Sequence, residues 1–250
     1  METPVKPDSQ SIAKATATVL GLLPQVAGLV FGLSALAYIV GWREMSAFYG
    51  GLGAPWATSL LTTVQIMTSS IWIVSGIGLF FVVAIYLLSQ GAASASSLRR
   101  WSIILLVVAI AMYLTFLLTP VGIARYFAAG MSICWSWSTG LALGELVGSL
   151  AENNLKWHSY HVHLLYFFLT FGLIYVSDIL GSAQAKTLLD SQGARFPDVV
   201  MQSGTRDIPW KLIAPIGDKM LLISFDQVSH KHMFKLVMAN NIETISAFGN

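Results

Sequence analysis

Long stretches without any charged residue dominate the first two thirds of the chain. The longest runs from Met45 to Leu98, and four others are Ala15–Trp42, Trp101–Ala124, Tyr126–Gly144 and Trp157–Ser177. A helix needs about 20 apolar residues to cross the hydrocarbon core of a bilayer, where each unpaired backbone polar group costs several kcal/mol. The pattern predicts a multi-pass protein whose first partner is the lipid bilayer itself.

Four segments inside these runs have the composition of membrane helices: Ala17–Val40, Ile66–Leu88, Trp101–Leu118 and Val162–Leu180. Between the first two we expect a loop over Trp42–Trp56, because the Gly and Pro residues from Gly50 to Pro55 disfavour regular helix. Tyr126–Leu150 is long enough to be a fifth crossing, but it is rich in Gly and Ser. The predicted fold class is therefore a membrane all-α bundle of four to five transmembrane helices over residues 1–183.

Basic residues bear on whether that fifth segment crosses. With four crossings and the N-terminus inside, six flanking basic residues lie inside (Lys6, Lys14, Arg99, Arg100, Lys186, Arg195) and three outside (Arg43, Arg125, Lys156). With five crossings the split is five to four, which is almost no bias. The positive-inside rule thus favours four crossings, with Arg99, Arg100 and the C-terminal residues all cytoplasmic.

The character of the chain changes after Leu180. Residues 181–250 hold 7 Lys/Arg and 6 Asp/Glu, as many as the 180 residues before them. We expect a helical extension that passes into a linker over residues 184–207, and a small β-rich, water-facing module over residues 208–250. Its strands are predicted at Trp210–Pro215, Lys219–Phe225, Met233–Met238 and Glu243–Ala247, separated by the turn-forming pairs Gly217-Asp218 and Asn240-Asn241. So small a module needs support from the bundle or from a partner.

Composition narrows the class further. The chain is 55% hydrophobic and 10% charged, and its net charge of +2 is too small to indicate a nucleic-acid partner. One cysteine, Cys134, excludes a disulfide within the chain and a cysteine-based metal cage. The run Tyr38–Leu61, with its Gly-Trp, aromatic and Gly-Ala-Pro-Trp elements, resembles bacterial inner-membrane proteins. We therefore expect the protein in a bacterial inner (cytoplasmic) membrane.

A stripe of small residues marks one face of the ambiguous segment. Its members recur every four residues, which keeps them on one side of a helix: Ser132, Ser136, Gly140, Gly144 and Gly148. Such a face lets two helix backbones approach closely in lipid. We interpret Ser136, Gly140, Gly144 and Gly148 as helix-packing positions within one bundle, with a homodimer contact as the alternative.

Two groups of polar residues are candidates for chemistry. Glu145 lies one residue beyond Gly144. An acidic residue at membrane depth is costly, so we interpret Glu145 as a possible intramembrane polar site for a proton or cation. His158, His161 and His163 are weak candidates for metal ligands, because zinc needs three or four convergent ligands and only the first two share a helix face. We therefore predict no metal and no cofactor.

No catalytic constellation is present: there is no Gly-x-Ser-x-Gly elbow, His-Glu-x-x-His, phosphate loop or dinucleotide fingerprint. We predict a protein that is not an enzyme and that binds another protein. It would act as an immunity-type protector against a membrane-active toxin, or as a regulatory or assembly subunit. The alternative is a small channel or transporter subunit, for which Glu145 and the small-residue stripe would supply the pathway.

Overall fold

The computed structural model describes residues 9–151, 160–191, 193–194, 196–201, 209–225 and 232–246. The chain forms two compact parts, Met1–Leu36 and Ala37–Asn250. The described residues of the first part form the beginning of helix α1 (Ser9–Leu52), and the remainder of α1 belongs to the second part.

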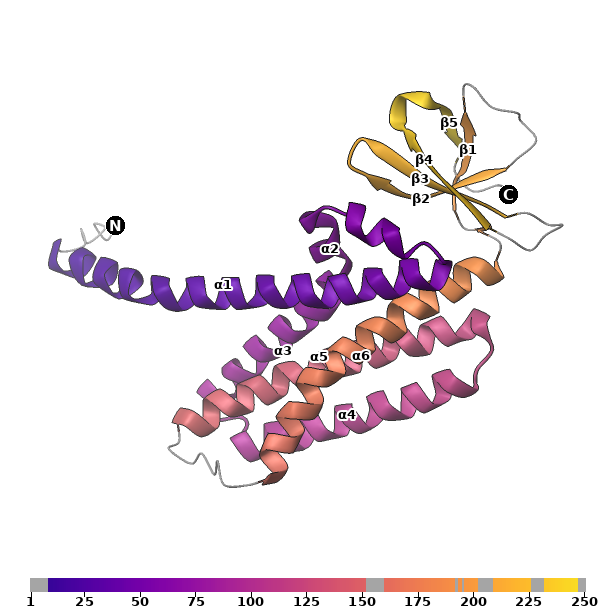
Figure 1. Ribbon diagram of the computed structural model, residues 1–250. Coiled ribbons are helices and arrows are strands. Elements are labelled where there is room, and N and C mark those ends of the chain that lie inside the picture. The colour runs from indigo at the N-terminus through magenta and orange to yellow at the C-terminus, as the bar shows by residue number, and fades with distance from the viewer. Residues whose placement is uncertain are drawn as a thin grey trace, which may run out of the picture. The chain divides into compact units, whose positions relative to one another are not determined.

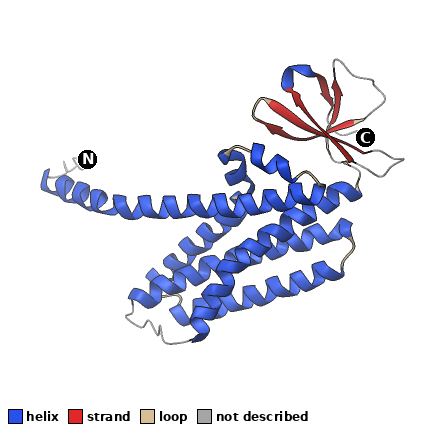
Figure 2. Cartoon of the chain, in the orientation of Figure 1, coloured by secondary structure: helices blue, strands red, loops and turns tan. Residues whose placement is uncertain are grey.

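Helices come first in the chain and strands follow (Figure 1, Figure 2). After α1 come the 3-10 helix η1 (Pro55–Leu60), α2 (Thr63–Ser69), α3 (Ile71–Ser89), α4 (Ala95–Leu118), α5 (Val121–Ala151) and α6 (Tyr160–Asp190). Three segments of the described chain are long and apolar enough to cross a membrane: α3, α4 and the Leu164–Asp190 portion of α6. The prediction of a mostly helical chain with membrane-length apolar helices is confirmed.

The loop expected over Trp42–Trp56 is wrong for most of its length. α1 continues as regular helix to Leu52, and the chain turns at Gly53, whose φ of +86° lies in the region that favours glycine. Gly51 lies in the helix where α6 passes close to it: a Cβ added at Gly51 would lie 2.8 Å from the Cβ of Ala185, so a residue without a side chain suits this position. This tertiary contact outweighs the poor helix propensity of two successive glycines.

The small-residue stripe of α5 faces α3. A Cβ added at Gly140 would lie 2.5 Å from the carbonyl oxygen of Ile77, and one added at Gly148 would lie 2.9 Å from Leu88 Cδ1. At Gly144 it would overlap the side chain of Ala84. Near the start of α3, Gly76 faces Ser136 in the same way. The two helices therefore approach along three turns with almost no side-chain volume from α5 between them.

These contacts also fix the direction of each helix. Residue numbers rise together along α3 and α5, so the two are parallel. Between α4 and α5 the numbers run in opposite senses, because Arg99 meets Glu145 whereas Ser102 meets Ser138. The same holds for α5 and α6, where Trp135 bonds Leu169 and Glu145 bonds Tyr166, so both pairs are antiparallel. Because α5 packs against α3, α4 and α6 over its length, Arg99 and the residues after Asp190 lie at opposite ends of the α3–α6 bundle.

This arrangement differs from the four-crossing hypothesis, which placed Arg99, Arg100 and the C-terminal residues on one side. The hypothesis weighed the polarity of Tyr126–Leu150 against a crossing. In the structure that polarity is hidden, since Ser136, Ser138 and Gly144 are buried against neighbouring helices. A central helix needs fewer apolar residues than one surrounded by lipid, so the burial of these polar residues does not argue against a crossing by α5. The structure has three candidate spans, in α3, α4 and α6, and a crossing by Tyr126–Leu150 stays a prediction.

The C-terminal residues form a five-stranded antiparallel sheet in the order β4-β3-β2-β1-β5. Its strands are β1 (Asp198–Met201), β2 (Trp210–Ile216), β3 (Lys219–Phe225), β4 (His232–Met238) and β5 (Ile242–Ser246), with a 3-10 turn, η2 (Ala239–Asn241), before the last. The four predicted strands are confirmed. β1 was not predicted: it lies in the stretch expected to be a linker, residues 184–207, whose first residues continue α6 as far as Asp190.

Side chains on the two faces of the sheet enter two different cores. Leu221 and Ile223 of β3 pack with Phe48, Leu52 and Leu188, which come from the C-terminal ends of α1 and α6. Leu222, between them, points to the other face and packs with Val199, Trp210 and Val237. The sheet is thus supported by the helices, as its small size requires. The module boundaries proposed from the sequence stay a prediction.

The packing of α5 on α3 generates a direct test. Replacing Gly144 with Leu should destabilise the fold far more than replacing Leu143 with Phe. The Cβ of the first variant meets Ala84 at once, whereas Leu143 is exposed and its replacement extends outward. Forced overpacking costs about 1–3 kcal/mol or more. The measurement is the yield of folded protein in mild detergent, and equal yields for the two variants would remove the interpretation.

Candidate functional site

Glu145 is the centre of a polar cluster that joins three helices. Its side chain is 1% exposed. One carboxylate oxygen, Oε1, pairs with the guanidinium of Arg99 on α4 and accepts a hydrogen bond from Ser149 Oγ at 3.0 Å. The other, Oε2, accepts a hydrogen bond from Tyr166 Oη on α6 at 2.6 Å. We call Arg99, Glu145, Ser149 and Tyr166 the Glu145 cluster.

Within this cluster, Arg99 supplies the counter-charge for Glu145. A buried carboxylate without a counter-charge is strongly destabilising, and removing one partner of a buried ion pair costs about 3–5 kcal/mol. Here Arg99 supplies the positive charge while its own side chain remains 40% exposed. Both oxygens of Glu145 accept from side chains of the protein itself, so the hydrogen-bond partners of the carboxylate are already in place. The cluster is therefore an interhelical polar contact that holds α4, α5 and α6 together, and it leaves no oxygen of Glu145 open to an ion.

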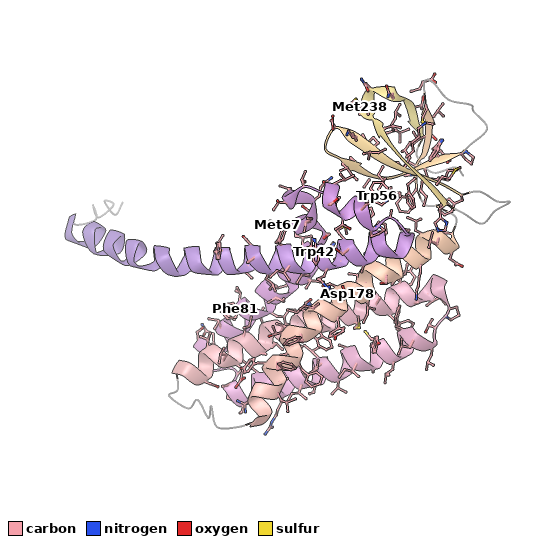
Figure 3. The ribbon with its side chains drawn as sticks, viewed as in Figure 1. Trp42, Trp56, Met67, Phe81, Asp178 and Met238 are labelled. Atoms are coloured by element: carbon pink, nitrogen blue, oxygen red, sulfur yellow. The ribbon has the colours of Figure 1, made fainter. Side chains whose placement is uncertain are left out.

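A second polar group joins α1 to α6 at the opposite end of the bundle. Arg43 pairs with Asp178, which Figure 3 labels on α6. Beside it, Glu44 Oε1 accepts a hydrogen bond of 3.3 Å from Gln184 Nε2. Gly181 allows the close passage, because an added Cβ there would overlap the backbone carbonyl of Glu44. We call Arg43, Glu44, Asp178 and Gln184 the α1–α6 junction.

Glu44 is the unusual member of this junction. Its side chain is 3% exposed, and its Oε2 is buried without a hydrogen-bond partner among the described residues. Burial raises the pKa of Glu44 to about 7, an effect that the hydrogen bond from Gln184 reduces only in part. The positive charge of Arg43 is directed to Asp178 instead. Glu44 therefore changes its charge near neutral pH.

The remaining predicted site residues are placed as follows. Ser136, Gly140, Gly144 and Gly148 lie on the face of α5 that α3 covers, next to Glu145 on the face toward α4 and α6. His158 lies outside the described residues. His161 and His163 fall in the first turn of α6, and their side chains lie outside the described part of the chain. Among the described side chains, no group of three or more His, Cys, Asp or Glu could hold a metal ion.

Sequence reasoning identified Glu145 and missed its partners. Arg99 and Arg43 were interpreted only as basic residues that flank predicted spans. The sequence did not connect Tyr166 with Glu145 or Asp178 with Arg43. Opposite charges at the ends of two spans are a weak signal of such pairing, and only the directions of the helices decide which charges meet.

Comparison of the chain with protein-family models, with curated proteins and with solved structures finds no match. Function must therefore be argued from the geometry of the chain itself.

The α1–α6 junction should respond to pH. Folding favours the protonated form of Glu44, because its pKa rises from 4.5 to about 7 in the folded chain. The stabilisation is fully present below about pH 4.5 and is lost as the pH rises through 7, by at most about 3 kcal/mol. Glu44→Gln keeps an acceptor for Gln184 and should flatten this dependence, whereas Glu243→Gln on exposed β5 should not. Unfolding in mild detergent between pH 4.5 and 8 gives the measurement; parallel profiles for Glu44→Gln and the unmutated chain would contradict the assignment.

Proposed function

We propose that this chain is a non-enzymatic integral membrane protein that binds another protein. The observation that carries the proposal is the closed environment of Glu145. A proton or cation pathway needs an intramembrane carboxylate that can exchange its ligand. Each Glu145 oxygen instead has a donor from the chain, and one of those donors is the cation Arg99. This supports the binding function over the channel or transporter alternative.

The sheet offers the surface for such a partner. β4 and β5 stand at its two edges in the described structure, and β5 is bonded on one side only, to β1. Edge strands present unpaired backbone groups that a second chain can extend. Exposed apolar side chains lie on these outer strands and on β1, among them Val200, Met233, Met238 and Ile245 (Figure 3, for Met238). Water-facing apolar groups beside an open edge are typical of a protein-binding surface.

The proposal covers an immunity-type protector against a membrane-active toxin and a regulatory or assembly subunit. The gene beside this one distinguishes the two. A neighbouring gene for a secreted effector supports protection, whereas a neighbouring gene for a membrane complex supports a subunit.

Site-specific crosslinking tests the binding function. A photoreactive amino acid at Met238 or Ile245 should give one discrete adduct in cells, because both side chains are exposed on the sheet. The control is the same amino acid at Leu79, whose side chain lies on the exposed apolar surface of α3, away from the sheet. The adduct should persist in the Glu145→Gln variant, since Gln still accepts from Tyr166 and the partly exposed Arg99 stays solvated.

The channel alternative predicts different results for the same variants. Purified protein in lipid vesicles would then conduct protons or cations, and Glu145→Gln would abolish that flux. Flux of this kind, together with no adduct at Met238 or Ile245, would overturn the proposal.

A further inference from the structure

An apolar groove lies between α4 and α6, both of which pack on α5. Its volume is about 600 Å³. Met131 and Trp135 of α5 line it together with Tyr113 of α4 and the α6 residues Phe167, Phe171 and Tyr175. Trp135 is held there by a hydrogen bond from its indole nitrogen to the carbonyl of Leu169 and by the contact of its ring with Gly172. The groove is thus a built feature with an ordered aromatic lining.

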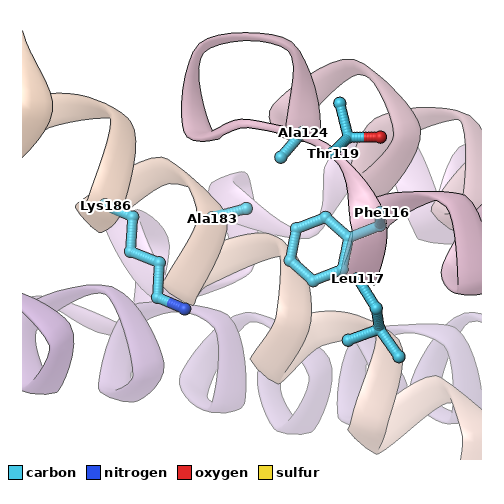
Figure 4. Close-up of a pocket in the computed structure, with 6 residues that line it drawn as sticks. All are labelled: Phe116, Leu117, Thr119, Ala124, Ala183 and Lys186. Atoms are coloured by element: carbon cyan, nitrogen blue, oxygen red, sulfur yellow. The ribbon is translucent and has the colours of Figure 1, made fainter.

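A smaller cavity of about 160 Å³ lies further along the same two helices (Figure 4). It is lined by Phe116, Leu117, Thr119, Ala124, Ala183 and Lys186. Ile179 belongs to the large groove, and Ala183 and Lys186 follow it at spacings of four and three, which keeps all three on one face of α6. The two cavities therefore follow one line on the bundle, and the smaller one lies toward the C-terminal end of α6.

The length of the two cavities along α6 matches that of one lipid acyl chain. From Phe167 to Ile179 the large groove follows α6 for about 18 Å, at about 1.5 Å per residue. Half of a bilayer's hydrocarbon core is about 15 Å thick. Lys186 lies two turns beyond Ile179, about 10 Å further toward the end of the bundle. A flexible lysine at that depth places its ammonium at the level of lipid headgroups.

Lys186 is a charged residue at one end of the two cavities. Its side chain is exposed, and it takes part in none of the ion pairs found among the described residues. The lining of the large groove carries no charge. A ligand that fits both features has a long apolar chain and an anionic head.

The lining also argues against a transmembrane helix as the occupant. Helices associate in lipid through small residues that let their backbones approach. The one glycine in this groove, Gly172, is already covered by Trp135, and bulky rings such as Phe167, Phe171 and Tyr175 line the remainder. Bulky rings accommodate a thin flexible chain better than they accommodate a second helix.

We propose that the groove between α4 and α6 binds one anionic phospholipid. One acyl chain lies along the aromatic lining from Ile179 toward Phe167, and the headgroup phosphate meets Lys186. This site is separate from the partner-binding surface proposed on the sheet, and neither proposal depends on the other.

Lipid retention tests the site on the full chain. The protein is purified from vesicles of phosphatidylcholine that contain a minor share of phosphatidylglycerol, and native mass spectrometry counts the lipids that remain bound. We expect one retained phosphatidylglycerol per chain. Lys186→Gln should lower its retention about fivefold, the effect of one basic residue near a membrane surface, and Lys186→Glu should lower it further. Lys235→Gln, which removes a charge from exposed β4, is the matched control and should change nothing.

A second pair of variants tests the acyl-chain groove. Ile179→Trp places a large ring in the groove and should abolish retention, whereas Ile104→Trp, at an exposed position on another face of α4, should not. If Ile179→Trp lowers the yield of folded protein, the Lys186 variants carry the test, since that side chain is exposed. Equal retention of phosphatidylglycerol in the unmutated chain, Lys186→Gln and Lys186→Glu would overturn the proposal. So would equal retention of phosphatidylcholine, or a protein helix that occupies the groove in place of lipid.

Discussion

The close approach of α5 to α3 is the interaction on which the bundle depends. Gly140, Gly144 and Gly148 put almost no side-chain volume between the two helices, so the backbone of one lies against the side chains of the other. In lipid there is no hydrophobic force to hold helices together, and dispersion across such a close contact takes its place. Because α3 occupies this face, the other faces of α5 are left for α4 and α6. The arrangement of α4 and α6 around α5 follows from that contact.

Polar contacts between the helices add to this packing. The Glu145 cluster fixes α4, α5 and α6 at one end of the bundle, and the α1–α6 junction fixes the C-terminal portion of α1 at the other. Between them, Ser102 and Ser138 exchange hydrogen bonds with each other's carbonyl groups across α4 and α5. These contacts have directions that dispersion lacks, so they set the rotation and the register of each helix. The sheet then rests on the ends of α1 and α6, where Phe48, Leu52 and Leu188 extend the core.

Elements that are determined by neighbouring residues could be predicted from the sequence, whereas elements that depend on distant contacts could not. β2 and β3 were placed within one residue, because short β-prone runs and the glycine turn between them at Gly217 determine them locally. β1 was missed because its four residues become a strand only by pairing with β2 and β5. The helical end of α1 was missed because Gly51 was interpreted as a turn residue, whereas in the structure it leaves room for the close passage of Ala185. Glu145 could be identified by its depth, but its pairing with Arg99 depends on the direction of α5.

The direction of α5 decides on which side of the membrane the sheet lies. If α5 crosses the membrane between α4 and α6, the turn before α4 and the sheet lie on opposite sides. Single cysteines at Ala92 and at Glu243, both exposed, can be introduced into the full chain after Cys134→Ser has removed the native thiol. A membrane-impermeant maleimide applied to intact cells should label one of the two and reach the other only after lysis. Labelling of both from the same side would contradict the account and restore the four-crossing topology.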